Sequence, residues 1–146
     1  MRYAVYVEGL SEMLFVADVL QKYSIVSSQG ADCRLHFAIM EYETWMLALI
    51  ENYVTNNGQN LAGICQQIGV DLTTCDPENS IYHPFPLTKR IFQACGEDYH
   101  KHGGESFSFL STLTVDDYER LRHSGRCASF LKFLDSLLGG PMPQLP

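Results

Sequence analysis

The chain has 146 residues and a formal net charge of −7 at pH 7, and 46% of its residues are hydrophobic against 18% charged. These values are typical of one globular domain and exclude a disordered chain. They also exclude a broadly basic nucleic-acid surface, although an acidic site can bind nucleic acid through bridging metal ions. No apolar run approaches the ~20 residues that cross a bilayer, and the five cysteines form no CxxC pair. We therefore expect a cytoplasmic protein with free thiols and no membrane association.

The N-terminal segment predicts a strand, a helix and a second strand. Residues 2–7, RYAVYV, are rich in β-branched and aromatic side chains, which favour a strand. Ser11 is a suitable N-cap for a helix that runs to Tyr23, because the apolar residues between them recur at helical spacing. Residues 24–33 predict a loop, and residues 34–40, RLHFAIM, predict the second strand.

The rest of the chain predicts mainly helices. Apolar residues recur at helical spacing over 41–54, 61–70, 87–95, 113–123 and 126–138. Thr114, with Asp117 three residues later, is close to the capping box that begins many helices. The proline-containing segment 76–86 predicts a loop.

This order of elements predicts a single α/β domain over residues 1–146. Its βαβα core covers residues 1–57 and contains a small parallel sheet with flanking helices. Residues 58–140 form a mostly helical part, and residues 141–146 form a flexible, proline-rich tail.

Acidic residues stand where the two predicted strands end. Glu8 closes the first strand immediately before a glycine, and Glu41 and Glu43 follow the second strand. Ligands collect at the carboxyl ends of parallel strands, so these side chains and Glu12 are expected to meet at one edge of the sheet. Carboxylates bind Mg²⁺, and two such ions about 4 Å apart can activate water for phosphodiester cleavage.

A structural role is the alternative for most of these acids. Glu12 lies at a helix start, where the helix dipole favours a negative charge. Glu41 and Glu43 equally fit the first turn of the next helix. Glu8 is different, because strand propensity does not explain a glutamate followed by glycine at a strand end.

Three short signatures resemble a known family. VYVEGLSE resembles the opening motif of Toprim domains, in which a strand ends in Glu-Gly and a Ser/Thr-Glu pair follows. HFAIMEYETWMLAL is similar to a second signature, found in Toprim-like proteins of unknown function related to the overcoming-lysogenization-defect nucleases. PFPLTKRIF with the following YHKH resembles a third, and CASFLKFLDSLL is similar to the last helix of that family.

The resemblance implies a Toprim-like sheet and a site that depends on Mg²⁺ or Mn²⁺. In it, Glu8 matches the Toprim glutamate, which acts as a catalytic acid/base or a metal ligand. Glu12 matches the second catalytic acid of the motif. Glu41 and Glu43 match the acidic pair of the second signature and would complete the metal ligands.

The resemblance also implies a nucleic-acid substrate. Lys89 and Arg90 match a basic pair that would bind phosphate, and Lys89 would assist catalysis. The implied function is a metal-dependent nuclease, or a related phosphodiester-processing protein, in phage defence. Its contact with nucleic acid would be bridged by the metal.

The sequence departs from the Toprim pattern between the first two signatures. Toprim domains carry there a central strand that ends in Asp-x-Asp or a single Asp. In this chain only residues 24–32, SIVSSQGAD, occupy the position, and Asp32 does not end an apolar strand. Either the central aspartates are absent or an internal segment is missing. The alternative function is therefore a non-catalytic interaction module in a defence or mobile-element system, with a protein partner or a homodimer.

Overall fold

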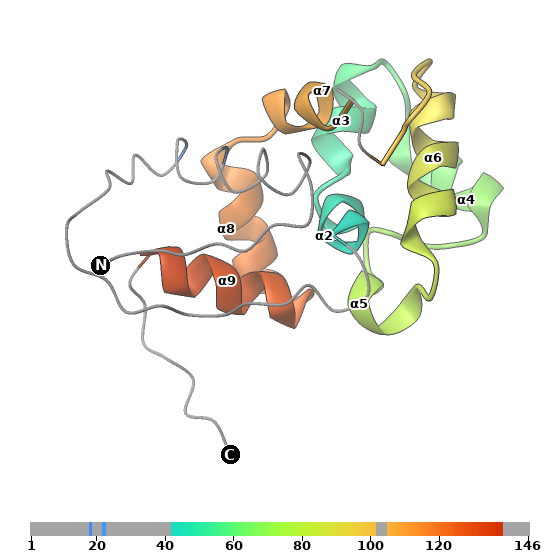
Figure 1. The fold of residues 1–146 in the computed structure, drawn as a ribbon. Coiled ribbons are helices and arrows are strands. Elements are labelled where there is room, and N and C mark those ends of the chain that lie inside the picture. Colours follow the sequence, from blue (N-terminus) through green and yellow to red (C-terminus); the bar gives the residue numbers. More distant parts are fainter. Residues whose placement is uncertain (1–17, 19–21, 23–41, 102–104, 139–146) are drawn as a thin grey trace.

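The computed structural model describes Asp18, Lys22 and residues 42–101 and 105–138 of the chain (Figure 1). Of these residues, 67% are helical and none lies in a strand. The helices are α2 (Glu43–Ala48), α3 (Glu51–Asn56), α4 (Leu61–Ile68), α5 (Pro77–Ser80), α6 (Pro84–Ala94), α7 (Glu105–Ser111), α8 (Val115–Ser124) and α9 (Ala128–Leu138). Within the described ranges, no helix is long and apolar enough to cross a bilayer.

The prediction of an α/β fold with a small parallel Toprim-like sheet is wrong. The described residues pack helix against helix, and no strand occurs among them. A short run of β-branched and aromatic residues fits a buried helix as well as a strand, so periodicity alone could not decide between them. The segments predicted as strands, 2–7 and 34–40, lie outside the described residues.

The predicted helix over 41–54 is divided into α2 and α3. The break falls at Leu49, whose backbone N–H donates to the carbonyl of Met46 at 3.0 Å. Five of the six residues of α2 are buried, as expected of an element at the centre of a core, whereas α3 buries only Tyr53 and Val54 and exposes most of its polar side chains. Accordingly, α2 packs against α5 and α6, and Figure 1 shows it between α6 and α9.

The segment 76–86 is largely helical, contrary to the predicted loop. Pro77 begins α5 and Pro84 begins α6. Proline is tolerated in a first helical turn, because its missing N–H would have no partner within the helix there. Asp76 supports the first of these starts, since its Oδ1 accepts a hydrogen bond from the N–H of Glu78 at 3.2 Å.

The capping box predicted at Thr114 is confirmed. Asp117 Oδ2 accepts hydrogen bonds from the N–H of Thr114 at 2.7 Å and from its hydroxyl at 2.8 Å. The Asp117 carboxylate is buried, and Asn52 Nδ2 donates to its Oδ1 at 2.8 Å and to its Oδ2 at 2.7 Å. The cap of α8 therefore also attaches α8 to α3.

The helix predicted from Ser11 to Tyr23 is described only at Asp18 and Lys22, and both are helical. Lys22 Nζ lies 2.8 Å from Asp18 Oδ1 and donates to the Leu110 carbonyl at 2.6 Å. The Tyr118 hydroxyl donates to Asp18 Oδ2 at 2.5 Å. These contacts join Asp18 and Lys22 to α7 and α8.

Aromatic rings fill the core in two groups. Trp45 of α2 stacks on Phe133 of α9 with ring centroids 5.4 Å apart, and its edge meets Phe130 at 5.2 Å. Tyr53 of α3 stacks on Phe92 of α6 at 4.4 Å. Such pairs stabilise by about 0.5–1.5 kcal/mol beyond the apolar area that they bury.

The N-terminus of α9 is capped by carboxylates from the region of α5. Both Glu78 oxygens accept the N–H of Ser129 at 3.1 Å, and the Ser129 hydroxyl donates to Glu78 Oε1. Trp45 Nε1 donates in turn to Ser129 Oγ at 2.9 Å. Asp76 Oδ1 accepts the N–H of Cys127 at 3.0 Å. A negative charge at a helix N-terminus is favourable, and here it joins α2, α5 and α9.

The loop before α5 is attached to the turn before α9 by one guanidinium group. Arg126 Nη1 donates to the carbonyl of Leu72 at 2.9 Å and to those of Thr73 and Cys75 at 3.2 Å. These three residues lie outside helices and strands, so one nitrogen of the Arg126 guanidinium supplies a donor that secondary structure does not.

The Glu78 cap predicts a large loss of stability in Glu78→Ala. We expect the free energy of unfolding to fall by about 2–3 kcal/mol, because two buried donors of Ser129 lose their acceptor. Glu78→Gln keeps one carbonyl acceptor and should lose less. Urea unfolding followed by circular dichroism measures both, with exposed Gln66→Ala on α4 as the control, expected within about 0.5 kcal/mol of wild type. Equal effects of Glu78→Ala and Gln66→Ala would contradict the cap.

Candidate functional site

The structure describes half of the predicted site. Glu43, Lys89 and Arg90 lie in the described residues, whereas Glu8, Glu12 and Glu41 do not. The convergence of all these side chains therefore stays a prediction, and only the surroundings of the first three can be compared with it.

Glu43 is the first residue of α2, and its side chain is 0% exposed. Its Oε1 accepts a hydrogen bond from the Tyr99 hydroxyl at 3.3 Å. The Tyr99 hydroxyl also makes a short hydrogen bond with the Tyr42 hydroxyl, which lies 3.1 Å from Ser106 Oγ. We call these four residues the tyrosine cluster. Glu43 therefore lies in the first turn of a helix, as the alternative structural role predicts, and its side chain is inside the core.

The Tyr99 hydroxyl stays protonated in this cluster. Burial, together with the neighbouring Tyr42 and Glu43, raises the pKa of Tyr99 above its usual range. A protonated hydroxyl can donate to a carboxylate, and this donation compensates for part of the cost of burying Glu43. The cluster connects α2 to the segment that precedes α7 and to α7 itself.

Lys89 and Arg90 follow one another on α6 but contact different parts of the protein. Lys89 Nζ lies 3.4 Å from Asp98 Oδ1, in a pair that is open to solvent. Arg90 Nη2 donates to the Gln67 carbonyl, at the end of α4, at 3.4 Å. Exposed pairs of this kind contribute little and rearrange easily, so a shared phosphate contact stays a prediction.

A charged cluster that sequence reasoning missed surrounds His100. Its Nδ1 lies 3.2 Å from Glu105 Oε1, and its Nε2 lies 3.5 Å from Asp98 Oδ2. Gln93 Nε2 also donates to Asp98, at 3.4 Å. The sequence contained a signal, an aspartate two residues before the histidine and a glutamate five residues after it, but that spacing belongs to no regular element.

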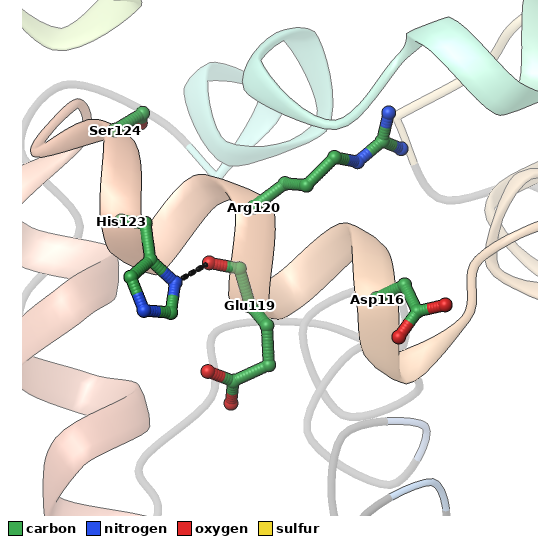
Figure 2. A pocket seen from close by; sticks show the side chains of 5 residues that line it. All are labelled: Asp116, Glu119, Arg120, His123 and Ser124. Carbon is green, nitrogen blue, oxygen red and sulfur yellow. Dashed lines mark hydrogen bonds between the residues drawn. The ribbon is translucent and has the colours of Figure 1, made fainter.

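A shallow hollow lies on the outer face of α8 (Figure 2). Its lining residues follow helical spacing on one side of the helix and are Asp116, Glu119, Arg120, His123 and Ser124. His123 Nδ1 donates to the Glu119 carbonyl at 2.7 Å, since a carbonyl oxygen only accepts. Figure 2 shows the Arg120 side chain extending away from those of Glu119 and His123.

Arg120 is held at the edge of this hollow by acids of two helices. Its Nη2 contacts Asp117 of α8, and its Nη1 lies 3.4 Å from Glu51 Oε2 of α3. Its charge is therefore offset locally. The carboxylates of Asp116 and Glu119 leave the face acidic, although Arg122 Nη1 approaches Glu119 Oε1 at 3.7 Å.

The described cysteines are free thiols, as the sequence predicts: Cys65, Cys75, Cys95 and Cys127. Burial raises the pKa of three of them, Cys75, Cys95 and Cys127. A thiol kept protonated is a poor nucleophile and a poor metal ligand. Among the described residues, no group of three or more His, Cys, Asp and Glu side chains is placed to hold a metal ion.

No protein-family model, curated protein or solved structure matches the chain. The resemblance to Toprim-like proteins therefore depends on the sequence signatures alone.

The tyrosine cluster predicts that Tyr99→Phe destabilises the protein by about 1–3 kcal/mol, because Glu43 loses a buried donor. Tyr53→Phe is the matched control. Its hydroxyl is also buried and makes no hydrogen bond among the described residues, although Glu97 is near enough to add to the effect of burial in raising the Tyr53 pKa. Urea unfolding should show a small effect for Tyr53→Phe. A smaller loss in Tyr99→Phe than in Tyr53→Phe would argue against the cluster.

Proposed function

We propose that this chain is a non-catalytic helical interaction module that binds a protein partner. The observation that best supports the proposal is the complete burial of Glu43 in the tyrosine cluster. An acid in that position holds α2 in the core, whereas a catalytic metal ligand needs access to the ion and its substrate. Glu78 and Asp117, the other strongly buried carboxylates of the described residues, likewise cap helices.

The outer face of α8 is the surface that fits a partner best. It combines a hollow with the exposed Asp116 and the half-buried Glu119, on a chain whose net charge is −7. Complementary charge steers association and selects partners. A partner with a basic segment is therefore favoured over a second copy, because two acidic faces would repel each other.

The proposal predicts that a captured partner is lost from the double variant Asp116→Asn/Glu119→Gln. This variant removes two negative charges from the α8 face without truncating a buried side chain. Tagged chain would be used to capture partners at low and high salt, and the captured protein would then be purified and its affinity measured. We expect binding to weaken in the variant and with increasing salt.

The control is Ala62→Lys/Gln66→Lys on exposed positions of α4, which changes the net charge by the same amount. It should bind like wild type. Size-exclusion chromatography with light scattering separates self-association from binding of another protein. A chain that forms no complex of either kind, or a control that loses binding as much as the α8 variant, would contradict the proposal.

A metal-dependent nuclease is the second candidate, and one sequence observation favours it. Glu8-Gly9 with Glu12 matches the Toprim opening, and strand propensity does not account for Glu8. Mg²⁺ or Mn²⁺ would then be held by Glu8 and Glu41, with Glu12 as the second acid. Lys89, which lies partly exposed on α6, would supply the phosphate contact.

Plasmid nicking distinguishes the two functions. Supercoiled DNA and single-stranded RNA would be incubated with the chain and Mg²⁺ or Mn²⁺, using wild type and Glu8→Gln. If the chain is a non-catalytic interaction module, wild type and Glu8→Gln should show the same background cleavage. Metal-dependent cleavage that falls by about 10²-fold or more in Glu8→Gln would instead establish the nuclease.

A further inference from the structure

The helices α3, α6 and α7 meet around the ring of Tyr53. This ring stacks on Phe92 of α6 with centroids 4.4 Å apart, and it meets Phe109 of α7 in a T-shaped arrangement at 6.0 Å (Figure 1). Tyr53 is 0% exposed, and its hydroxyl has no hydrogen-bond partner among the described residues. Burying a hydroxyl without a partner costs free energy, and a bound water or ion is one physical reason why a fold retains such a group.

A first carboxylate reaches this junction from the end of α6. Glu97 follows the helix, and its backbone N–H donates to the Phe92 carbonyl at 2.9 Å. Its side chain extends to α7, where its Oε1 accepts the Ser108 hydroxyl at 2.9 Å. The Glu97 carboxylate therefore lies between α6 and α7, beside the ring pair that contains Tyr53.

A second carboxylate lies on the facing side of α7. Glu105 begins this helix, and Ser108 and Phe109 stand three and four positions further on, so all three share one side of it. Phe109 contacts Tyr53, and the Ser108 contact with Glu97 has the same direction. The Oε2 atom of Glu105 is buried and, like the Tyr53 hydroxyl, has no hydrogen-bond partner among the described residues.

The two carboxylates make the junction negative. Burial raises the pKa of Tyr53 above its usual range, and the charges of Glu97 and Glu105 raise it further, so the hydroxyl stays neutral. Glu105 meets His100 through Oε1, which leaves Oε2 to the junction. Within the described ranges, no Lys, Arg or His forms an ion pair with Glu97. A cation placed between the carboxylates offsets both charges.

We propose that Glu97 and Glu105 bind a hard divalent cation, Mg²⁺ or Ca²⁺, at the junction of α3, α6 and α7. Carboxylate oxygens are the protein ligands that both ions prefer, and water fills the rest of the coordination shell. The Tyr53 hydroxyl donates to one of these waters, and Ser108 orients Glu97, so both are positioning residues. The ion ties the end of α6 to α7.

The small number of protein ligands sets the strength of this site. Two carboxylates are fewer than the three or more acidic, histidine or cysteine side chains that no part of the described chain brings together. We therefore expect a dissociation constant on the order of 10⁻⁴ to 10⁻³ M, because affinity increases with the number of charged ligands. The site is separate from the outer face of α8 and from the metal ligands that the sequence predicts.

Mn²⁺ locates the site on the full chain, because carboxylates bind it as they bind Mg²⁺ and Ca²⁺ and because it broadens the NMR signals of nearby nuclei. At substoichiometric Mn²⁺ we expect the strongest broadening of backbone amides at Glu97 and at residues 105–109. Excess Mg²⁺ or Ca²⁺ should reverse the broadening. Separate competition titrations with these two ions show which of them the site prefers.

Glu97→Gln and Glu105→Gln each remove one charged ligand at constant size, and each should weaken Mn²⁺ binding roughly tenfold or more. Tyr53→Phe should weaken it less, roughly two- to fivefold, because it removes only a hydrogen bond to a coordinated water. Glu51→Gln, an exposed acid at the start of α3, is the matched control and should bind like wild type. Circular dichroism verifies that each variant is folded.

Two results overturn this site directly. One is the absence of broadening at Glu97 and along α7, and the other is broadening that persists unchanged in both glutamine variants. Broadening centred instead on Glu8, Glu12 and Glu41 also overturns it, and favours the metal-dependent nuclease.

Discussion

The buried hydrogen bonds between Glu78 and Ser129 are the interaction on which the described fold depends most. They place a carboxylate against the N–H of Ser129 in the first turn of α9 and, through the Trp45 indole, fix α2 beside both elements. The aromatic stacking of Trp45 on Phe133 can form only when α9 lies at this position. One polar contact thereby determines where a large apolar surface is buried.

Acidic residues in this chain build structure wherever the structure describes them as buried. Glu78 caps α9, Asp117 caps α8 and accepts the Asn52 amide, and Glu43 receives the Tyr99 hydroxyl. A buried carboxylate is tolerated only when donors replace its hydration. For Glu78 and Asp117 a donor comes from another helix, so the bond that compensates the charge also specifies how two helices pack. For Glu43 the donor comes from the segment between α6 and α7.

Features that depend on neighbouring residues could be predicted from the sequence, whereas features that depend on packing between distant residues could not. The helices near 61–70, 87–95, 113–123 and 126–138 and the capping box at Thr114 depend on residues a few positions apart, and they occur as expected. The break at Leu49 and the helical start at Pro77 were missed, because packing and a proline in a first turn overrode the pattern. The sheet was wrong, since its strands were inferred from short runs that carry no unambiguous period.

The candidate site shows the same limit. Residue types and order suggested that Glu43 belonged with other acids, yet contacts 56 positions away along the chain place it beside Tyr99. No local pattern contains that information. The His100 cluster was missed for a related reason, because its acids are neighbours only through the course of the α6–α7 connection.

The capping of α9 from a distance has a consequence for how the chain acquires its structure. Glu78 and Ser129 are 51 positions apart, and Trp45 and Ser129 are 84 apart. Closing loops of that size precedes any gain from the contact, so high contact order slows this step. During synthesis the ring of Trp45 emerges long before its partners on α9. The apolar surface of Trp45 therefore stays uncovered until α9 has also left the ribosome, and a chaperone can protect the nascent chain during that interval.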